Sequence, residues 1–114
     1  MAYKVKYTEQ AEEDLDIIVQ YFCEDLQNPI SAERFLDDVD KKIAILRDNP
    51  LLFPLHHDKR LFDEGYRFSV IGNYLMFYAF DEDNEVVHII KIVHGGRDIP
   101  TLYNAFPSNP FASN

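Results

Sequence analysis

Four side chains in the C-terminal half of the chain could bind an anion or move a proton: Arg67, His94, Arg97 and Tyr103. Arginine holds phosphate or carboxylate oxygens through paired N–H groups, and histidine exchanges a proton near neutral pH. His94 and Arg97 belong to the stretch HGGRD, which follows the apolar run VVHIIKI. Two interpretations stay open: a plain turn made by two glycines, or a strand end that presents a working cation.

Other chemistries find little support. The four histidines are too dispersed for a zinc site, and GxGxxG, GxxxxGK[ST] and GxSxG motifs are absent, so we expect neither a metal nor a cofactor. Cys23 is the single cysteine, which excludes an internal disulfide. Its place beside Phe22 in an apolar helix predicts a buried or half-buried thiol without reactivity.

Composition places the chain among single-domain proteins. With 114 residues and 46% hydrophobic residues, residues 1–114 can form one domain with its own core. The net charge of -9 repels phosphate backbones, so we expect no direct binding to duplex DNA. Neither a signal-peptide h-region nor an apolar run of about 18 residues is present, which predicts a cytoplasmic protein without a membrane contact.

The first half of the chain predicts one strand and two helices. YKVKYT, residues 3 to 8, alternates apolar and cationic side chains as a half-buried strand does. Thr8 can cap a helix from about 9 to 27, and Pro29 suits the start of a second helix that ends near residue 48. Residues 51 to 64 show no clear period and predict a loop. Apolar residues recur three and four apart along both helices: Ala11, Leu15, Ile18, Phe22 and Leu26, then Ala32, Phe35, Leu36, Val39, Ile43 and Leu46.

Three strands follow, at about 65–71, 74–80 and 86–93, and Gly72-Asn73 is a two-residue hairpin signal. The predicted fold class is α+β with the order β-α-α-β-β-β, an antiparallel meander joined by the first strand and covered on one face by a two-helix hairpin. A meander puts Arg67 and His94 at opposite ends of their strands, and Arg67 would then simply pair with an acidic residue. A short extension from about 104, with Phe106 and Phe111, is predicted to be docked or loose.

Several stretches in this order resemble the ParE/RelE toxin superfamily of type II toxin–antitoxin modules, whose members include plasmid stabilisation proteins. They are AERFLDDVDKKIAIL, GYR at 65 to 67, GNY-x-x-x-Y at 72 to 78 and HGGRD with Pro100, and the match covers about residues 3 to 103. The resemblance implies the α+β fold derived above. It also implies one of two activities, because RelE-like members cleave mRNA on the ribosome whereas ParE-like members inhibit DNA gyrase by binding.

The RelE-like pattern is only half present. Arg67, Arg97 and Tyr103 match expected catalytic positions and His94 could act as acid or base, but Ser69 and Leu75 replace two expected cations. The resemblance to the ParE branch is therefore greater. It implies a growth-inhibiting toxin, neutralised by a cognate antitoxin held in a groove across helices and sheet, with Arg67, Arg97 and Asp98 contacting gyrase. The alternatives are a ribosome-dependent endoribonuclease that uses Arg67, His94, Arg97 and Tyr103, or a non-toxic partner-binding module.

Overall fold

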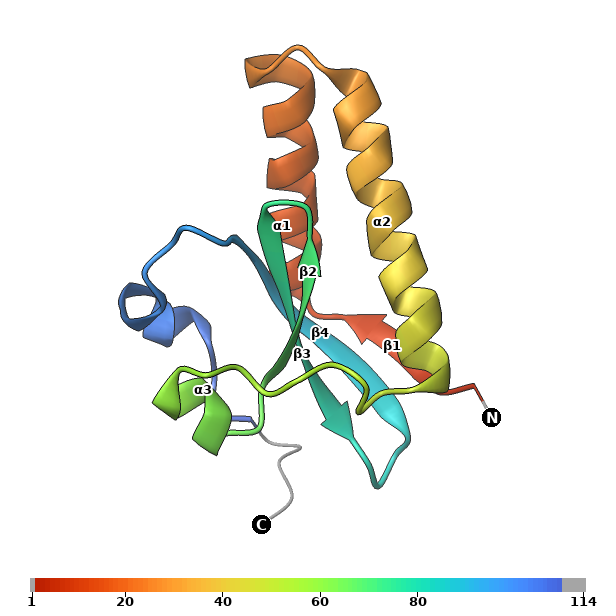
Figure 1. Cartoon of the computed structure of the whole chain (residues 1–114), viewed down its shortest axis with the longest axis vertical. Coiled ribbons are helices and arrows are strands. Elements are labelled where there is room, and N and C mark those ends of the chain that lie inside the picture. The colour runs from red at the N-terminus through yellow and green to blue at the C-terminus, as the bar shows by residue number, and fades with distance from the viewer. Residues whose placement is uncertain (1, 110–114) are drawn as a thin grey trace.

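A four-stranded sheet with the order β1-β4-β3-β2 forms the centre of the molecule (Figure 1). The computed structural model describes residues 2–109. The strands are β1 (Lys4–Tyr7), β2 (Arg67–Ile71), β3 (Tyr74–Asp81) and β4 (Val86–His94). β2, β3 and β4 form the predicted antiparallel meander, and β1 joins β4 in parallel orientation. The predicted α+β class and the order of its elements are confirmed.

Two long helices, α1 (Glu9–Gln20) and α2 (Pro29–Asp48), form a hairpin that extends beyond the sheet (Figure 1). The Thr8 hydroxyl accepts from the Ala11 amide (3.1 Å), and Asn28 caps α2 in the same way. After Gln20, α1 continues as one π-helical turn, η1 (Tyr21–Asp25). None of the described helices is long and apolar enough to cross a bilayer.

The predicted burial of Cys23 is wrong, because its side chain is exposed. Neighbouring residues on a helix point about 100° apart, so half-buried Phe22 does not carry Cys23 inwards with it. Leu26, predicted to belong to the apolar stripe, is 49% exposed for a related reason. The π-helical turn before it changes the residue period and rotates the stripe away from the sheet.

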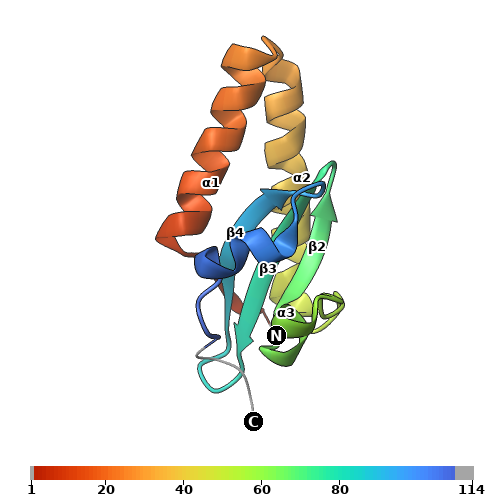
Figure 2. The same cartoon turned by 90° about the vertical axis from the view of Figure 1, so that its left-hand side faces the viewer.

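The two faces of the sheet carry separate cores. The helical hairpin packs on one face, over a cluster that includes Val39, Ile71 and Met76. The other face is covered by α3 (Lys59–Asp63) and by the 3-10 helix η2 (Ile99–Ala105), which lie in front of the sheet in Figure 2.

The prediction of a loop throughout 51 to 64 is wrong for Lys59–Asp63. Asp58 caps this short helix through the Leu61 amide (3.2 Å), and Leu61 is fully buried beneath it. Lys59 pairs with Asp63 at 2.8 Å one turn later. A helix of five residues is too short to show a repeating apolar period, and a local cap with one buried anchor specifies it instead.

The C-terminal extension is docked as far as it is described. Phe106 is 1% exposed and stacks edge-to-face on Phe77 and Tyr66 (centroids at 4.9 and 5.7 Å). The chain therefore completes its second core with a residue close to its end. Phe111, the other aromatic residue of the predicted extension, lies outside the described residues.

Replacing Phe106 with alanine should destabilise the protein by about 3–5 kcal/mol, the usual cost of deleting a buried phenylalanine. Urea denaturation measures this loss directly. Phe62→Ala is the matched control, since Phe62 is 52% exposed and its loss should change the free energy of unfolding by less than about 0.5 kcal/mol. Equal effects of the two variants would contradict a docked C-terminal segment.

Candidate functional site

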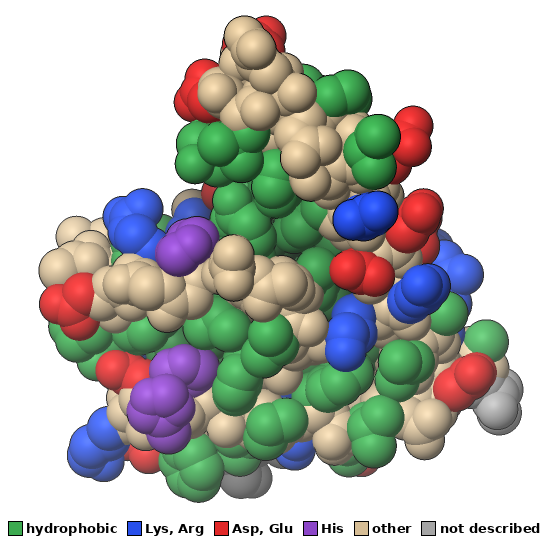
Figure 3. Space-filling view, turned by 45° about the horizontal axis from the view of Figure 1, so that its top comes forward, with side chains coloured by type: hydrophobic (Ala, Val, Ile, Leu, Met, Phe, Trp, Pro, Cys, Tyr) green, Lys and Arg blue, Asp and Glu red, His purple; other side chains and the backbone are tan. Residues whose placement is uncertain are grey.

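A groove lies between α1, the end of β4 and the C-terminal segment, with a volume of about 590 Å³. Its apolar lining includes Ile17 from α1, Tyr21 from η1, Tyr74 from β3 and Leu102 from η2. Ile17 is 58% exposed and Tyr21 is 43% exposed, although both are large and apolar. Figure 3 shows hydrophobic side chains gathered where the helical hairpin meets the sheet, with basic side chains and a histidine beside them.

At the base of the groove, Lys91 forms an ion pair with Asp14 at 3.3 Å, and both side chains are largely buried. The Asp14 carboxylate also accepts from the Ile92 amide (3.0 Å). A buried pair with an additional hydrogen bond offsets the cost of desolvating both charges. This contact joins α1 to β4 and fixes the separation of the groove's two main walls.

His94 and Arg97 stand at the rim of the groove, and both are exposed. The His94 Nδ1 atom accepts from the Gly96 amide (3.1 Å), and the His94 carbonyl accepts from the Arg97 amide (3.1 Å). A Cβ atom on Gly95 would come within 3.2 Å of the Asn73 carbonyl oxygen, so glycine suits this close approach. The HGGRD stretch therefore forms a tight turn and also exposes the Arg97 cation at the rim of the groove.

The Arg97 side chain makes no ion pair with Asp98 or with any other acid among residues 2–109. Asp98 is exposed and begins η2, where its carbonyl accepts from the Thr101 amide (3.2 Å) and hydroxyl (2.6 Å). Both side chains of this turn are thus available to a partner.

Arg67 lies elsewhere, at the start of β2, and its guanidinium donates to the Phe53 carbonyl (2.7 Å) and the Leu51 carbonyl (3.3 Å). Among residues 2–109 it forms no ion pair with an acid, so the prediction that Arg67 simply pairs with an acidic residue is wrong. In the sheet register Arg67 pairs with Tyr78 of β3. Tyr78 in turn pairs with Ile89, which lies several residues before the end of β4 at His94. The structure does not bring Arg67 together with His94 and Arg97, and the side chain holds the 51–53 segment against the sheet.

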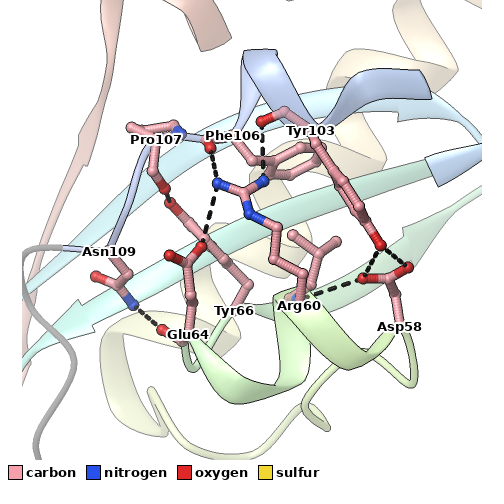
Figure 4. A network of polar contacts seen from close by, with 9 residues as sticks. Asp58, Arg60, Glu64, Tyr66, Tyr103, Phe106, Pro107 and Asn109 are labelled. Atoms are coloured by element: carbon pink, nitrogen blue, oxygen red, sulfur yellow. Dashed lines mark hydrogen bonds and ion pairs between the residues drawn. The ribbon is translucent and has the colours of Figure 1, made fainter. Parts of the chain in front are cut away.

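Tyr103 lies in a third region of the molecule, in a polar network that holds the C-terminal segment on α3 (Figure 4). Its hydroxyl donates to both oxygens of Asp58 (2.8 and 3.0 Å). Burial acts to raise the pKa of Asp58, but hydrogen bonds from Tyr103 and from the Leu61 and Arg60 amides outweigh it and lower the pKa. The hydrogen bond to Asp58 likewise raises the pKa of the Tyr103 hydroxyl.

Arg60 is the centre of this network. Its guanidinium donates to the carbonyls of Tyr103 (2.8 Å) and Phe106 (2.6 Å), and it stacks over the Tyr103 ring at 5.1 Å. Tyr66 donates to the Pro107 carbonyl, and Asn109 donates to the Glu64 carbonyl (2.8 Å). The segment that carries Leu102 to the groove is thereby anchored at several points.

The two positions where RelE-like cations are expected lie on different faces of the sheet. Ser69 is 1% exposed on β2, beside Ile71 of the core beneath the helical hairpin. Leu75 packs against the cluster on the opposite face. Neither side chain could support a phosphate group held between Arg67 and Arg97, so the matching residues form no common anion site.

Sequence reasoning missed Asp58, Arg60 and the Asp14–Lys91 pair. A helix start at Asp58, with Lys59 and Asp63 four residues apart, was a usable local signal for α3. The contacts of Arg60 with Tyr103 and of Asp14 with Lys91 join residues far apart in the chain, and no local pattern predicts them. Among the described residues, no three His, Cys, Asp or Glu side chains are placed to hold a metal ion.

Replacing Tyr103 with phenylalanine should make the free energy of unfolding change less with pH in the acidic range. A carboxyl whose folded-state pKa is lowered contributes stability above its unfolded pKa, and loses it as the pH falls through the folded pKa. We therefore expect the variant to unfold at a lower temperature than wild type near neutral pH, and this difference to shrink below about pH 4. Thermal unfolding between pH 3 and pH 7 measures both, with Tyr3→Phe as control. A difference that does not change with pH would contradict the role of Asp58.

Known proteins of one family share this fold. The model of the ParE toxin family, type II toxin–antitoxin system parDE, matches residues 5–99. A chain from the chromosomal ParDE system of P. aeruginosa superposes with a TM-score of 0.63 at 18% identity, over 82% of this chain and 96% of that one. A mutant of the E. coli toxin RelE in the free state superposes with a TM-score of 0.57 at 16% identity, over 92% of this chain and 94% of that one.

An archaeal RelE–RelB complex from Pyrococcus horikoshii gives a TM-score of 0.50 at 20% identity, over 86% and 100% of the two chains. At such identities these structures support the shared fold alone. No curated protein matches the chain significantly. The family model covers most of the chain, from β1 to the start of η2. The chain belongs to the ParE toxin family of type II toxin–antitoxin systems.

Proposed function

We propose that this toxin stops growth by binding DNA gyrase and that a cognate antitoxin neutralises it. The observation that carries the proposal is the separation of the side chains that match RelE-like catalytic positions. Arg67 is engaged by the carbonyls of the 51–53 segment, Tyr103 by Asp58, and Arg97 stands at the rim of the groove. Such a surface supports recognition of a protein more readily than cleavage of RNA.

Cleavage of RNA by a metal-independent nuclease needs several donors aimed at one scissile phosphate. Loss of a single such donor typically lowers the rate by about 10² to 10³. Ser69 and Leu75 supply no charge at their positions, and they point into opposite cores. A RelE-like mechanism would have to act with Arg97 and His94 alone, which is why we rank it second.

A protein target also agrees with the charge of the chain. The net charge of -9 disfavours docking on ribosomal RNA, whereas an apolar groove with an exposed arginine is a common protein-binding arrangement. Arg97 and Asp98 are the proposed gyrase contacts. Arg67 would contribute indirectly, through the exposed Leu51 and Leu52 that it holds in place.

An antitoxin partner is proposed on two grounds. The P. aeruginosa and P. horikoshii structures are described as a toxin–antitoxin system and a toxin–antitoxin complex. The groove also leaves large apolar side chains of α1 in contact with water, and such a surface is typical of a binding site. An antitoxin that covered the groove would shield Arg97 at the same time.

Expression of the chain without its antitoxin should stop DNA synthesis before protein synthesis. Pulse labelling of both processes in one bacterial culture makes the distinction. Arg97→Glu should abolish or strongly delay the arrest, because it reverses the exposed charge at the proposed contact. Lys41→Glu, an equal charge change on the exposed face of α2, should leave the arrest unchanged.

An early loss of translation, with cleavage of ribosome-bound mRNA in vitro, would establish the nuclease and sink the gyrase proposal. Growth unaffected by strong expression of folded protein would instead indicate a non-toxic partner-binding module. Circular dichroism of each purified variant separates a failure to fold from a loss of contact.

A further inference from the structure

Two histidines of the chain close the same kind of turn. The Nδ1 atom of His56 accepts from the Asp58 amide (3.0 Å), and the Nδ1 atom of His94 accepts from the Gly96 amide (3.1 Å). In both turns the donor lies two residues later, as it does in the turns that asparagine and aspartate side chains close. The two turns differ in burial, because His56 is 3% exposed whereas His94 lies at the surface.

The His56 ring is enclosed by other rings. It packs against Phe68 of β2 and Phe77 of β3, with centroids at 5.0 and 5.3 Å, and it stacks on His57 at 4.2 Å. β2 and β3 thus face it with uncharged side chains, and among the described residues His57 and the Asp58 carboxylate are the titratable groups that act on it. Burial lowers the pKa of His56, His57 lowers it further, and Asp58 acts in the opposite direction. The folded chain therefore favours the neutral ring.

The His56 turn positions the residue that begins α3. Asp58, whose amide the His56 ring holds, caps α3 by accepting from the Leu61 amide (3.2 Å). The Asp58 carboxylate also accepts from the Tyr103 hydroxyl on the C-terminal segment (Figure 4). A helix of five residues has too few internal hydrogen bonds to be stable alone. The position of Asp58 therefore supports both α3 and its contact with the C-terminal segment.

Protonation of the His56 ring is incompatible with this turn. An imidazolium carries a hydrogen on both nitrogens, so its Nδ1 atom no longer accepts a hydrogen bond. The Asp58 amide would lose its acceptor, and a charge would stand against Phe68 and Phe77, where it is poorly solvated. The same charge would attract the Asp58 carboxylate, in competition with the Tyr103 hydroxyl. All of these effects act against the arrangement at the start of α3.

We propose that His56 is an acid-sensitive latch for α3 and the C-terminal segment. The neutral ring holds the Asp58 amide, and its protonation frees the start of α3 and loosens the contact of Asp58 with Tyr103. That contact is one of the anchors of the segment that carries Leu102 to the groove. The latch gives the chain a response to pH that neither gyrase binding nor antitoxin binding requires.

The direction of the response follows from the pKa of the ring. Because the pKa of His56 is lower in the folded chain than its ordinary value of about 6.5, the neutral ring stabilises the fold above that pH. This contribution is lost as the pH falls through the folded-state pKa. Asp58 stays ionised in the same range, because its own pKa is lowered. The latch therefore opens on the acidic side of neutrality, before the Asp58 carboxyl is protonated.

Nuclear magnetic resonance of the full chain, labelled with ¹⁵N, tests the latch between about pH 8 and about pH 4.5. At high pH the proton of the neutral His56 ring should lie on Nε2, and the ring should titrate with a midpoint below about 6.5. Over the same range, the protection of the Asp58 and Leu61 amides from hydrogen exchange, corrected for the intrinsic effect of pH, should fall by about tenfold or more. The Phe106 amide, which donates to the Tyr103 carbonyl (3.1 Å), should follow if the C-terminal segment is released.

His56→Asn separates the latch from a general effect of acid. The asparagine Oδ1 atom can accept from the same amide and does not titrate, so the protection of the Leu61 and Phe106 amides should not change with pH in this variant. His94→Asn is the matched control, because it changes the other histidine turn, at the surface. Its amides in α3 should respond to pH as those of the wild type do.

A His56 ring that stays neutral down to about pH 4.5, or that titrates while the Asp58 and Leu61 amides keep their protection, would overturn the latch. A His56→Asn variant with the pH response of the wild type would also overturn it. Protection lost in α3 but kept at Phe106 would overturn the coupling to the C-terminal segment. If His56→Asn does not fold, the titration of the wild-type chain decides alone.

Discussion

The difference in length between β1 and β4 determines most of the surface described above. β1 stops at Tyr7 because Thr8 turns the chain into α1, with its amide bonded to the Ile89 carbonyl (3.0 Å) and its hydroxyl to the Ile90 carbonyl (3.1 Å). Beyond that point, no strand of the described part of the chain pairs with β4 on this side. α1 lies beside this part of β4 in place of β1, and the Asp14–Lys91 ion pair sets the distance between α1 and β4. The groove is the space that remains.

The opposite wall depends on a different constraint, the attachment of the C-terminal segment. Arg60 binds two carbonyls of that segment, Tyr66 binds a third, and Phe106 fills the core behind them. Backbone carbonyls are satisfied by these side chains where neither a long helix nor a strand is present. The wall that carries Leu102, and the turn that carries Arg97, are therefore parts of a packed structure, with little freedom to adjust to a partner.

The order and type of the long elements could be predicted from the sequence. Both helices have one buried face with a clear period, and the central strands are apolar runs bounded by turn residues. Two local features were not predictable in that way. α3 is too short to show a period, and the π-helical turn after Gln20 alters the period within a helix, so Cys23 and Leu26 were misplaced. Resemblance to RelE-like enzymes grouped Arg67, His94, Arg97 and Tyr103, but folding distributes them over three places. Long-range contacts such as Tyr103 with Asp58 decide that distribution, and a single sequence does not contain them.

A supercoiling assay with purified DNA gyrase tests the central claim most directly, because neither ribosomes nor cellular metabolism takes part. Increasing amounts of the purified toxin should inhibit the supercoiling of relaxed plasmid, and prior addition of the antitoxin should prevent the inhibition. Undiminished supercoiling in the presence of a large excess of folded toxin would contradict a mechanism in which this chain acts by binding gyrase.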